Sequence, residues 1–240
     1  MDTAAGAAGA VSQLEGRRVL VAMSGMPLAR RLVQGLMRHG ARVVEIRAAF
    51  HERAQAEAAI VDAANELGGA DLIVHASALP PALSARPIEE LSREDWHAAV
   101  HGSALTTLFC LQAAHACQRA SGGAVVVIGP STALVGAAQL VPLMTVAEAQ
   151  RTLVKAAARQ WGAVGMRLNW VGVAAAQYDP ALAEAALPQT PELGPPPPAL
   201  HRVPEAQADV ADVVAWLGSA GASGVTGSTL NLDGGDWMLP

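Results

Sequence analysis

Residues 18–47 of this 240-residue chain read RVLVAMSGMPLARRLVQGLMRHGARVVEIR. The apolar run at 19–22 is typical of a short strand buried on both faces of a parallel sheet. Apolar residues then recur at the spacing of an amphipathic helix, which His39 and Gly40 would end. A second apolar run begins at Val43. The stretch therefore predicts a strand, a tight turn, a helix and a second parallel strand.

The same alternation continues to the end of the chain. Buried strands are expected at 71–75, 125–128, 167–173 and 228–232, and helices at 52–67, about 96–120, 146–161 and 209–218. Strands that alternate with helices predict an α/β protein with a doubly wound parallel sheet. The length suits one domain of this kind. We therefore expect a flexible N-terminal tail over 1–16 and a single domain over 17–240.

Composition restricts the class of protein. Apolar residues make up 52% of the chain and charged residues 15%, which predicts apolar faces covered by other subunits. No apolar run approaches the ~20 residues of a membrane-spanning helix, and the N-terminus does not resemble a secretion signal. A net charge of −5 argues against nucleic acid or an anionic membrane as partner. Cys110 and Cys117 are expected to be reduced thiols, which predicts a cytoplasmic location.

The turn after the first strand lacks the residues of a dinucleotide site. Such a turn normally carries glycines, so that the backbone can approach the pyrophosphate at the helix N-terminus. Here residues 23–29 read MSGMPLA, with Gly25 as the one glycine. The side chain of Met23 would fill the space for phosphate, and Pro27 removes a backbone donor. This turn is therefore not expected to bind a dinucleotide.

Four later stretches carry a family resemblance. They are EDW at 94–96, GGAVVVI at 122–128, GMRLNWV at 165–171 and VTGSTLNLDGG at 225–235. In this order and spacing they resemble the short-chain dehydrogenase/reductase family, whose members end in a similar TG…VDGG signature. The resemblance covers nearly all of the chain after the tail. It implies a Rossmann-like sheet and descent from NAD(P)-dependent oxidoreductases.

The catalytic residues of that family do not carry over. The family uses an asparagine, a serine, a tyrosine that acts as acid and base, and a lysine four residues after it. These positions fall on Ser103, Pro130, Leu143 and Ala147. Proline and leucine side chains can neither donate nor accept a proton. The single tyrosine, Tyr178, and the single lysine, Lys155, cannot be aligned as the missing pair.

The cofactor residues of the family are missing as well. Its three glycine positions hold Met23, Pro27 and Ala29, and its acidic ribose-binding position holds Arg47. An arginine there could bind a 2′-phosphate, but without the glycine turn we expect a solvated charge. Only residues 48–70 separate Arg47 from the next strand, where the family has helix, strand and helix. A parallel crossover needs a dozen or more residues, so one helix and the third strand are expected to be deleted.

Three other polar positions have alternative interpretations. His75 could be a replacement base, but a histidine bonded to the backbone is expected. His97 and His101 have the spacing of a zinc pair, but no acidic third ligand sits at a recognisable spacing, so we expect a surface or packed histidine pair and no metal site. Ser131 could stand in for the catalytic serine, although a surface-loop serine is expected.

The helices at about 96–120 and 146–161 remain strongly apolar while the reactive positions are lost. In the family these helices pack against the same helices of a neighbouring subunit. The resemblance therefore implies a non-catalytic subunit of a heterotetramer. An active homologue would bring NAD(P) and act on a hydroxyacyl or ketoacyl thioester, as in the heteromeric dehydrogenase of the benzylsuccinate pathway. The C-terminal end would join this contact. A homo-oligomeric ligand-binding protein and an enzyme with relocated catalytic groups remain the alternatives.

Overall fold

The computed structural model of the chain describes residues 12–182 and 198–238. In these residues six parallel strands form one sheet in the order β2-β1-β3-β4-β5-β6. The strands are β1 (Arg18–Ala22), β2 (Arg42–Ile46), β3 (Leu72–His75), β4 (Gly123–Pro130), β5 (Met166–Val173) and β6 (Thr229–Leu232). The parallel α/β sheet expected from the sequence is confirmed.

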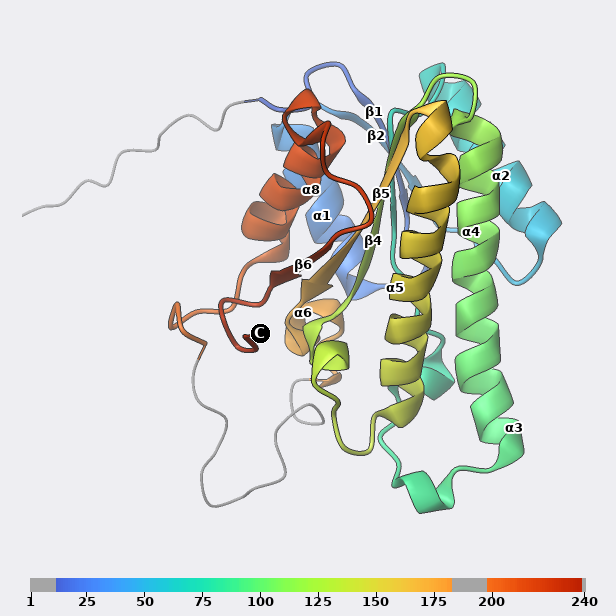
Figure 1. Cartoon of the computed structure of the whole chain (residues 1–240), viewed down its shortest axis with the longest axis vertical. Helices are drawn as coiled ribbons and strands as arrows, with labels where there is room; N and C mark the ends of the chain where they lie inside the picture. Colours follow the sequence, from blue (N-terminus) through green and yellow to red (C-terminus); the bar gives the residue numbers. More distant parts are fainter. Residues whose placement is uncertain (1–11, 183–197, 239–240) are drawn as a thin grey trace, which may run out of the picture.

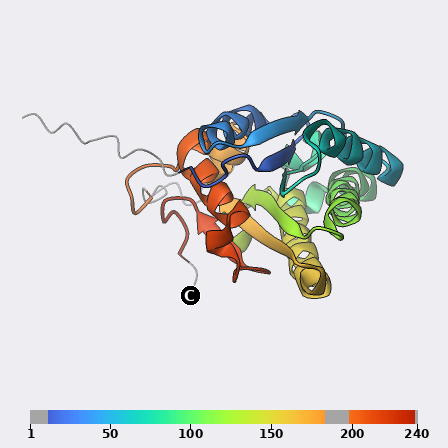
Figure 2. The same ribbon diagram turned by 90° about the horizontal axis from the view of Figure 1, so that it is seen from above.

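Helices cover both faces of the sheet (Figure 1, Figure 2). One layer contains α1 (Pro27–Arg38) and α8 (Ala211–Gly218), and the other contains α2 (Arg53–Leu67), α4 (Gly102–Gln118) and α5 (Val141–Trp161). Three short segments complete the helical layers. They are α3 (Arg93–Trp96) with its π-helical continuation η3 (His97–His101), α6 (Ala175–Tyr178), and the π-helical turn η6 (Ala206–Val210) before α8.

Local sequence explains most of these boundaries. Gly68 ends α2 in the left-handed conformation, with φ of 77°, as expected for a glycine cap. Helix α5 begins at Val141, five residues before the predicted start at 146. Pro142 lies in its first turn, where a missing N–H costs no hydrogen bond. The prediction was wrong because this proline starts the helix.

The segment between β2 and β3 contains α2 and no strand. The chain crosses from β2 over β1 to β3, because β1 lies between them in the sheet. The expected deletion of one helix and one strand is therefore confirmed. As a consequence, β2 is an edge strand.

The predicted end of the tail needs correction. Leu14 is fully buried, and its N–H donates to the carbonyl of His39 at 3.0 Å. The N–H of Gly16 donates to the carbonyl of Gly40 at 3.0 Å. Residues 12–16 are thus packed against the loop before β2, because Leu14 contributes to the core. Residues 1–11 lie outside the described residues.

Two further expectations concern membranes and thiols. No helix in the described ranges has both the length and the apolar character needed to cross a membrane. Cys110 is buried and Cys117 is half-buried on α4, and both thiols are free. Burial raises the pKa of the Cys110 thiol, which keeps it protonated.

Candidate functional site

The candidate site lies at the carboxyl ends of the parallel strands, where doubly wound sheets bind ligands. Ser103, on α4, lies in this region and is fully buried. Its hydroxyl donates to the carbonyl of Ala99 at 2.6 Å and accepts from the N–H of Leu79 at 3.0 Å. Both bonds are to backbone groups, so this hydroxyl holds the loop after β3 against α4.

The other three positions carried over from the family hold apolar side chains. Pro130 ends β4, and Leu143 and Ala147 lie one turn apart on α5, which packs against β4. Leu143 is 0% exposed and Ala147 is 1% exposed. A buried leucine and alanine provide no group that could transfer a proton or hold a ribose.

A buried chain of hydrogen bonds crosses this region instead. The side-chain amide of Gln150, on α5, donates to the carbonyl of Ser77 at 2.8 Å and to the hydroxyl of Thr107 at 3.0 Å. The Thr107 hydroxyl lies 3.1 Å from Nε2 of His75, and Nδ1 of His75 lies 2.8 Å from the carbonyl of Ala22. A carbonyl can only accept, so Nδ1 carries the proton and Nε2 accepts from Thr107.

His75 is therefore occupied at both ring nitrogens. The side chain is buried, and desolvation lowers the pKa of His75 to about 4. The imidazole is neutral near pH 7 and has no free lone pair with which to act as a base. The expected histidine bonded to the backbone is confirmed, and His75 does not have the geometry of a relocated catalytic base.

The turn that would bind pyrophosphate is occupied by its own contacts. The Ser24 hydroxyl donates to the carbonyl of Arg47 at 2.7 Å, which ties the turn to the end of β2. Met23 is buried at 2% exposure, and its carbonyl accepts from the N–H of Met26. The N–H of Ala29 donates to the carbonyl of Met26, and Pro27 has no N–H. Few donors remain for an anion at the start of α1.

Arg47 lies at the end of β2, as the alignment indicated. Its side chain is 83% exposed and pairs with Glu45 at 3.3 Å. This is the solvated charge expected from the sequence, and a surface pair of this kind contributes little to stability.

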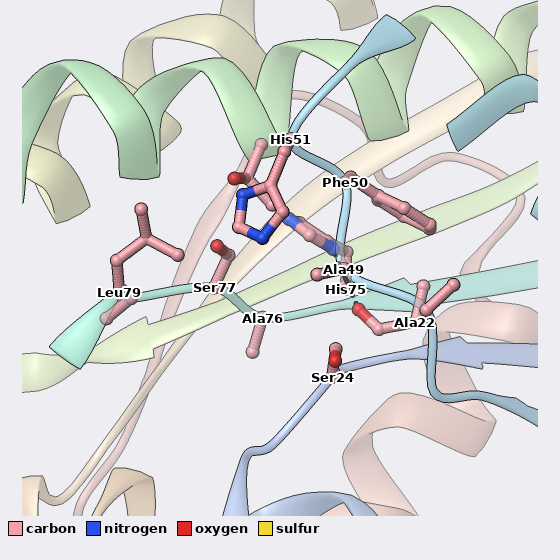
Figure 3. Close-up of a pocket in the computed structure, with 12 residues that line it drawn as sticks. Ala22, Ser24, Ala49, Phe50, His51, His75, Ala76, Ser77 and Leu79 are labelled. Carbon is pink, nitrogen blue, oxygen red and sulfur yellow. Dashed lines mark hydrogen bonds between the residues drawn. The ribbon is translucent and has the colours of Figure 1, made fainter. Parts of the chain in front are cut away.

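Phe50 lies on the loop after β2 and packs over the end of β3. It is 3% exposed, and its ring is stacked on that of His75. The remaining cavity has a volume of about 50 Å³, which is room for a few waters. Figure 3 places Ser24, Ser77 and His51 around it, on the loops that follow β1, β3 and β2. This volume is smaller than that of the pockets that usually hold small-molecule ligands.

The structure also places the two paired histidines and Ser131, which the sequence singled out. His97 and His101 stack with 4.6 Å between ring centroids, and both residues are exposed, so they form a surface pair, one of the two arrangements expected. No cluster of three possible metal ligands occurs in residues 12–182 and 198–238. Ser131 is fully buried, so the expectation of a surface-loop serine was wrong. It begins the 3-10 turn Ser131–Leu134, which packs beneath α5.

The sequence analysis missed Gln150, Thr107, Phe50 and the burial of Tyr178. A signal for two of them exists in the spacing. Gln150 follows Leu143 and Ala147 on the same apolar face of α5, and Thr107 follows Ser103 by one turn of α4. A lone polar residue on such a face predicts a buried hydrogen bond. Burial also raises the pKa of Tyr178, which keeps its hydroxyl protonated.

The fold agrees with comparisons to known proteins. A family model described as enoyl-(acyl carrier protein) reductase matches residues 4–236. The chain therefore belongs to the short-chain dehydrogenase/reductase family. A search of curated proteins finds no match.

Solved structures show the same fold at low identity. A protein described as a short-chain alcohol dehydrogenase from Sinorhizobium meliloti is 22% identical, with a TM-score of 0.77, over 94% of this chain and 98% of its own. A 3-ketoacyl-(acyl-carrier-protein) reductase from Brucella melitensis, solved with NADH, is 16% identical, with a TM-score of 0.77, over 94% and 100%. A short-chain dehydrogenase/reductase from Mycobacterium marinum is 18% identical, with a TM-score of 0.77, over 95% and 98%.

Proposed function

We propose that this chain is a non-catalytic subunit of a heteromeric, cytoplasmic short-chain dehydrogenase/reductase. An active homologue in the same complex would bind NAD(P) and act on a hydroxyacyl or ketoacyl thioester. The thioester class is supported by one structural neighbour, the 3-ketoacyl-(acyl-carrier-protein) reductase of Brucella melitensis. The single domain over 17–240, extended to begin at residue 12, would be the unit that assembles.

The proposal rests on two features at the carboxyl ends of the strands. Reactive side chains are missing there, and buried side chains leave little room for a ligand. Leu143 and Ala147, the residues that the sequence alignment places at the family's tyrosine and lysine positions, are buried. Phe50 stacks on His75 at the carboxyl ends of β2 and β3, which leaves a cavity of only about 50 Å³ there. The positions Met23, Pro27 and Ala29 replace the glycines of the turn. Substitutions that restored the tyrosine and lysine would still leave a turn without the glycines of a dinucleotide site. This combination favours a structural role.

A surface for the partner lies on the outer sides of α4 and α5. The groove between these helices has a volume of about 570 Å³. Its lining is mainly apolar and small, which lets another helix approach closely. The lining residues are His101, Ala104, Leu105, Leu108, Thr145, Glu148, Ala149, Thr152 and Leu153. At the C-terminal end, Met238 is 75% exposed and would add apolar area.

The test uses the chain together with an intact family member from the same genome. We expect the two to co-purify, and we expect 3-ketoacyl-CoA reduction by the intact member to rise when this chain is present. Leu108→Asp should abolish the association, because it buries a charge in the groove. Leu200→Asp, at an exposed apolar residue outside the groove, is the matched control. An unchanged association in Leu108→Asp would contradict the proposed surface.

Calorimetric titration of the isolated chain with NADH and NADPH separates the alternatives. No binding is expected. Micromolar binding with turnover would favour an enzyme with relocated groups. Binding without turnover would favour a ligand-binding protein that uses the old cleft.

A further inference from the structure

The edge strand β2 presents unpaired backbone groups to the surface. β2 pairs with β1 and with no other strand in the described chain. The N–H of Arg42 donates to the carbonyl of Arg17 on the β1 side. Alternate residues of a strand direct their backbone groups to alternate sides, so Val44 and Ile46 also face β1. The N–H and C=O groups of Val43 and Glu45 therefore point away from the sheet.

These four groups have no backbone partner among the described residues. The surrounding side chains do not cover the edge fully. Val43, Val44 and Glu45 are half-buried, and Arg42 is exposed. An uncovered edge of this kind is a template for another strand. The strand deleted between β2 and β3 is the reason that this edge is open.

We propose that two copies of this chain associate through antiparallel pairing of their β2 edges, which joins two six-stranded sheets into one. A second copy fits because the contact can be two-fold symmetric, so each copy supplies the same uncovered edge. An intact homologue with the extra strand of the family would have its own β2 covered. This inference is independent of the function proposed above, because it uses the β2 edge of the sheet and not the outer surface of α4 and α5 or the C-terminal end beyond β6.

The backbone pattern selects one register. A residue whose backbone groups point away from the sheet must pair with such a residue of the second copy. This allows three pairings between the copies: Val43 with Glu45, Val43 with Val43, or Glu45 with Glu45. The last register places two carboxylates directly opposite each other, which is unfavourable. Pairing Val43 with Glu45 satisfies all four outward groups of each copy. It also places Val44 opposite Val44 of the second copy, at the two-fold axis.

The register makes a specific prediction for cysteine cross-linking. Residues in a non-hydrogen-bonded antiparallel pair have Cα atoms about 4.5 Å apart, which a disulfide can bridge. Val44→Cys should therefore form a disulfide-linked dimer under mild oxidation. Val43→Cys should not, because it faces Glu45 and not its own symmetry mate. The native Cys110 and Cys117 are present in both variants, so they provide the same background.

Light scattering after size exclusion gives the second readout. The wild-type chain should have twice the mass of the 24.5 kDa monomer or a multiple of that. Glu45→Pro removes an outward N–H without removing a bond to β1, so it should lose this association while it remains folded by circular dichroism. Glu45→Ala keeps the N–H and should retain it.

The same two readouts distinguish this contact from the groove of α4 and α5. Self-association that survives Glu45→Pro but is lost in Leu108→Asp would overturn the β2 contact. So would equal cross-linking of Val43→Cys and Val44→Cys. If Glu45→Pro fails to fold, the cysteine pair alone decides, because neither substitution removes a backbone donor. Failure of the heteromeric function would leave both outcomes unchanged.

Discussion

The rings of His75 and Phe50 lie parallel to within 12°, with 6.3 Å between their centroids. His75 ends β3, and Phe50 lies on the loop after β2, so the stack joins two strand ends. The same imidazole bonds to Ala22 at the end of β1 and to Thr107 on α4. One neutral ring thus connects the ends of β1, β2 and β3 with α4. Three of the four predictions below concern this arrangement.

Stability should fall at mildly acidic pH because of His75. Burial lowers the pKa of His75 to about 4 in the folded chain, against about 6.5 when unfolded. The unfolded chain therefore binds more protons between these values. The free energy of unfolding should be highest above about pH 6.5. It should decrease as the pH falls towards 4, by at most ~1.4 kcal/mol per pH unit for this one group. Urea titrations across this range measure the slope.

His75→Gln is the control for that slope, since it keeps a polar side chain and does not titrate. The variant should be less stable at pH 7 and should show a smaller dependence on pH than the wild type. An identical slope in both proteins would assign the effect to other titratable groups, such as Asp71 or Asp209, whose ion pairs lower their pKa.

Phe50→Ala should open the cleft without restoring a cofactor site. Removal of a buried phenyl ring is expected to cost about 3–5 kcal/mol of folding stability. Phe50→Leu, the matched control, should cost less, because it fills more of the volume. Neither variant should bind NADH, because Met23 and Pro27 still occupy the turn. Saturable NADH fluorescence enhancement in Phe50→Ala would contradict this account.

Thr107 and Gln150 should behave as one unit. Thr107→Val leaves the amide of Gln150 and Nε2 of His75 each without one partner, which should cost about 1–3 kcal/mol. Gln150→Leu should cost a similar amount. The double variant should cost less than the sum, because the second substitution removes a group already left unpaired. Additive losses in a denaturation cycle would mean that the two bonds are independent.

Gly35 allows α1 to approach the segment before α8. A methyl group at Gly35 would lie 2.3 Å from the Cβ of Ala211 and 2.4 Å from the carbonyl oxygen of Gln207, at distances that require the backbone to move. Gly35→Ala should therefore destabilise the fold by about 1–3 kcal/mol despite the better helix propensity of alanine.

Gly162→Ala provides the comparison, because nothing lies within 4 Å of the added methyl group and the backbone is helical. That variant should be neutral or more stable. Equal melting temperatures for the two variants would mean that the close contact at Gly35 relaxes freely.

Much of the fold could be predicted from the chain itself. The apolar run at 19–22 and the spacing of the following helix fixed the first strand, turn and helix. The 23 residues at 48–70 were too few for a second crossover, and the structure has one helix there. Two boundaries were predicted wrongly. Pro142 starts a helix, and Leu14 anchors a segment otherwise rich in small residues.

For the candidate site, the sequence predicted only which reactive side chains are missing. Leu143 and Ala147 cannot transfer a proton in any conformation, so their identity alone was sufficient. The contacts that replaced the site could not be found in this way. Phe50, His75, Thr107 and Gln150 lie on four separate elements, and no short-range pattern relates residues that meet only after folding.

The sequence by itself determined the alternation of strands and helices, the family, and the absence of the usual reactive side chains, because these depend on residue type and local spacing. The tertiary structure decided that Phe50 stacks on His75 at the ends of β2 and β3, and that β2 is an open edge. Those outcomes depend on which distant segments come into contact and on which backbone groups remain unpaired when the sheet is complete.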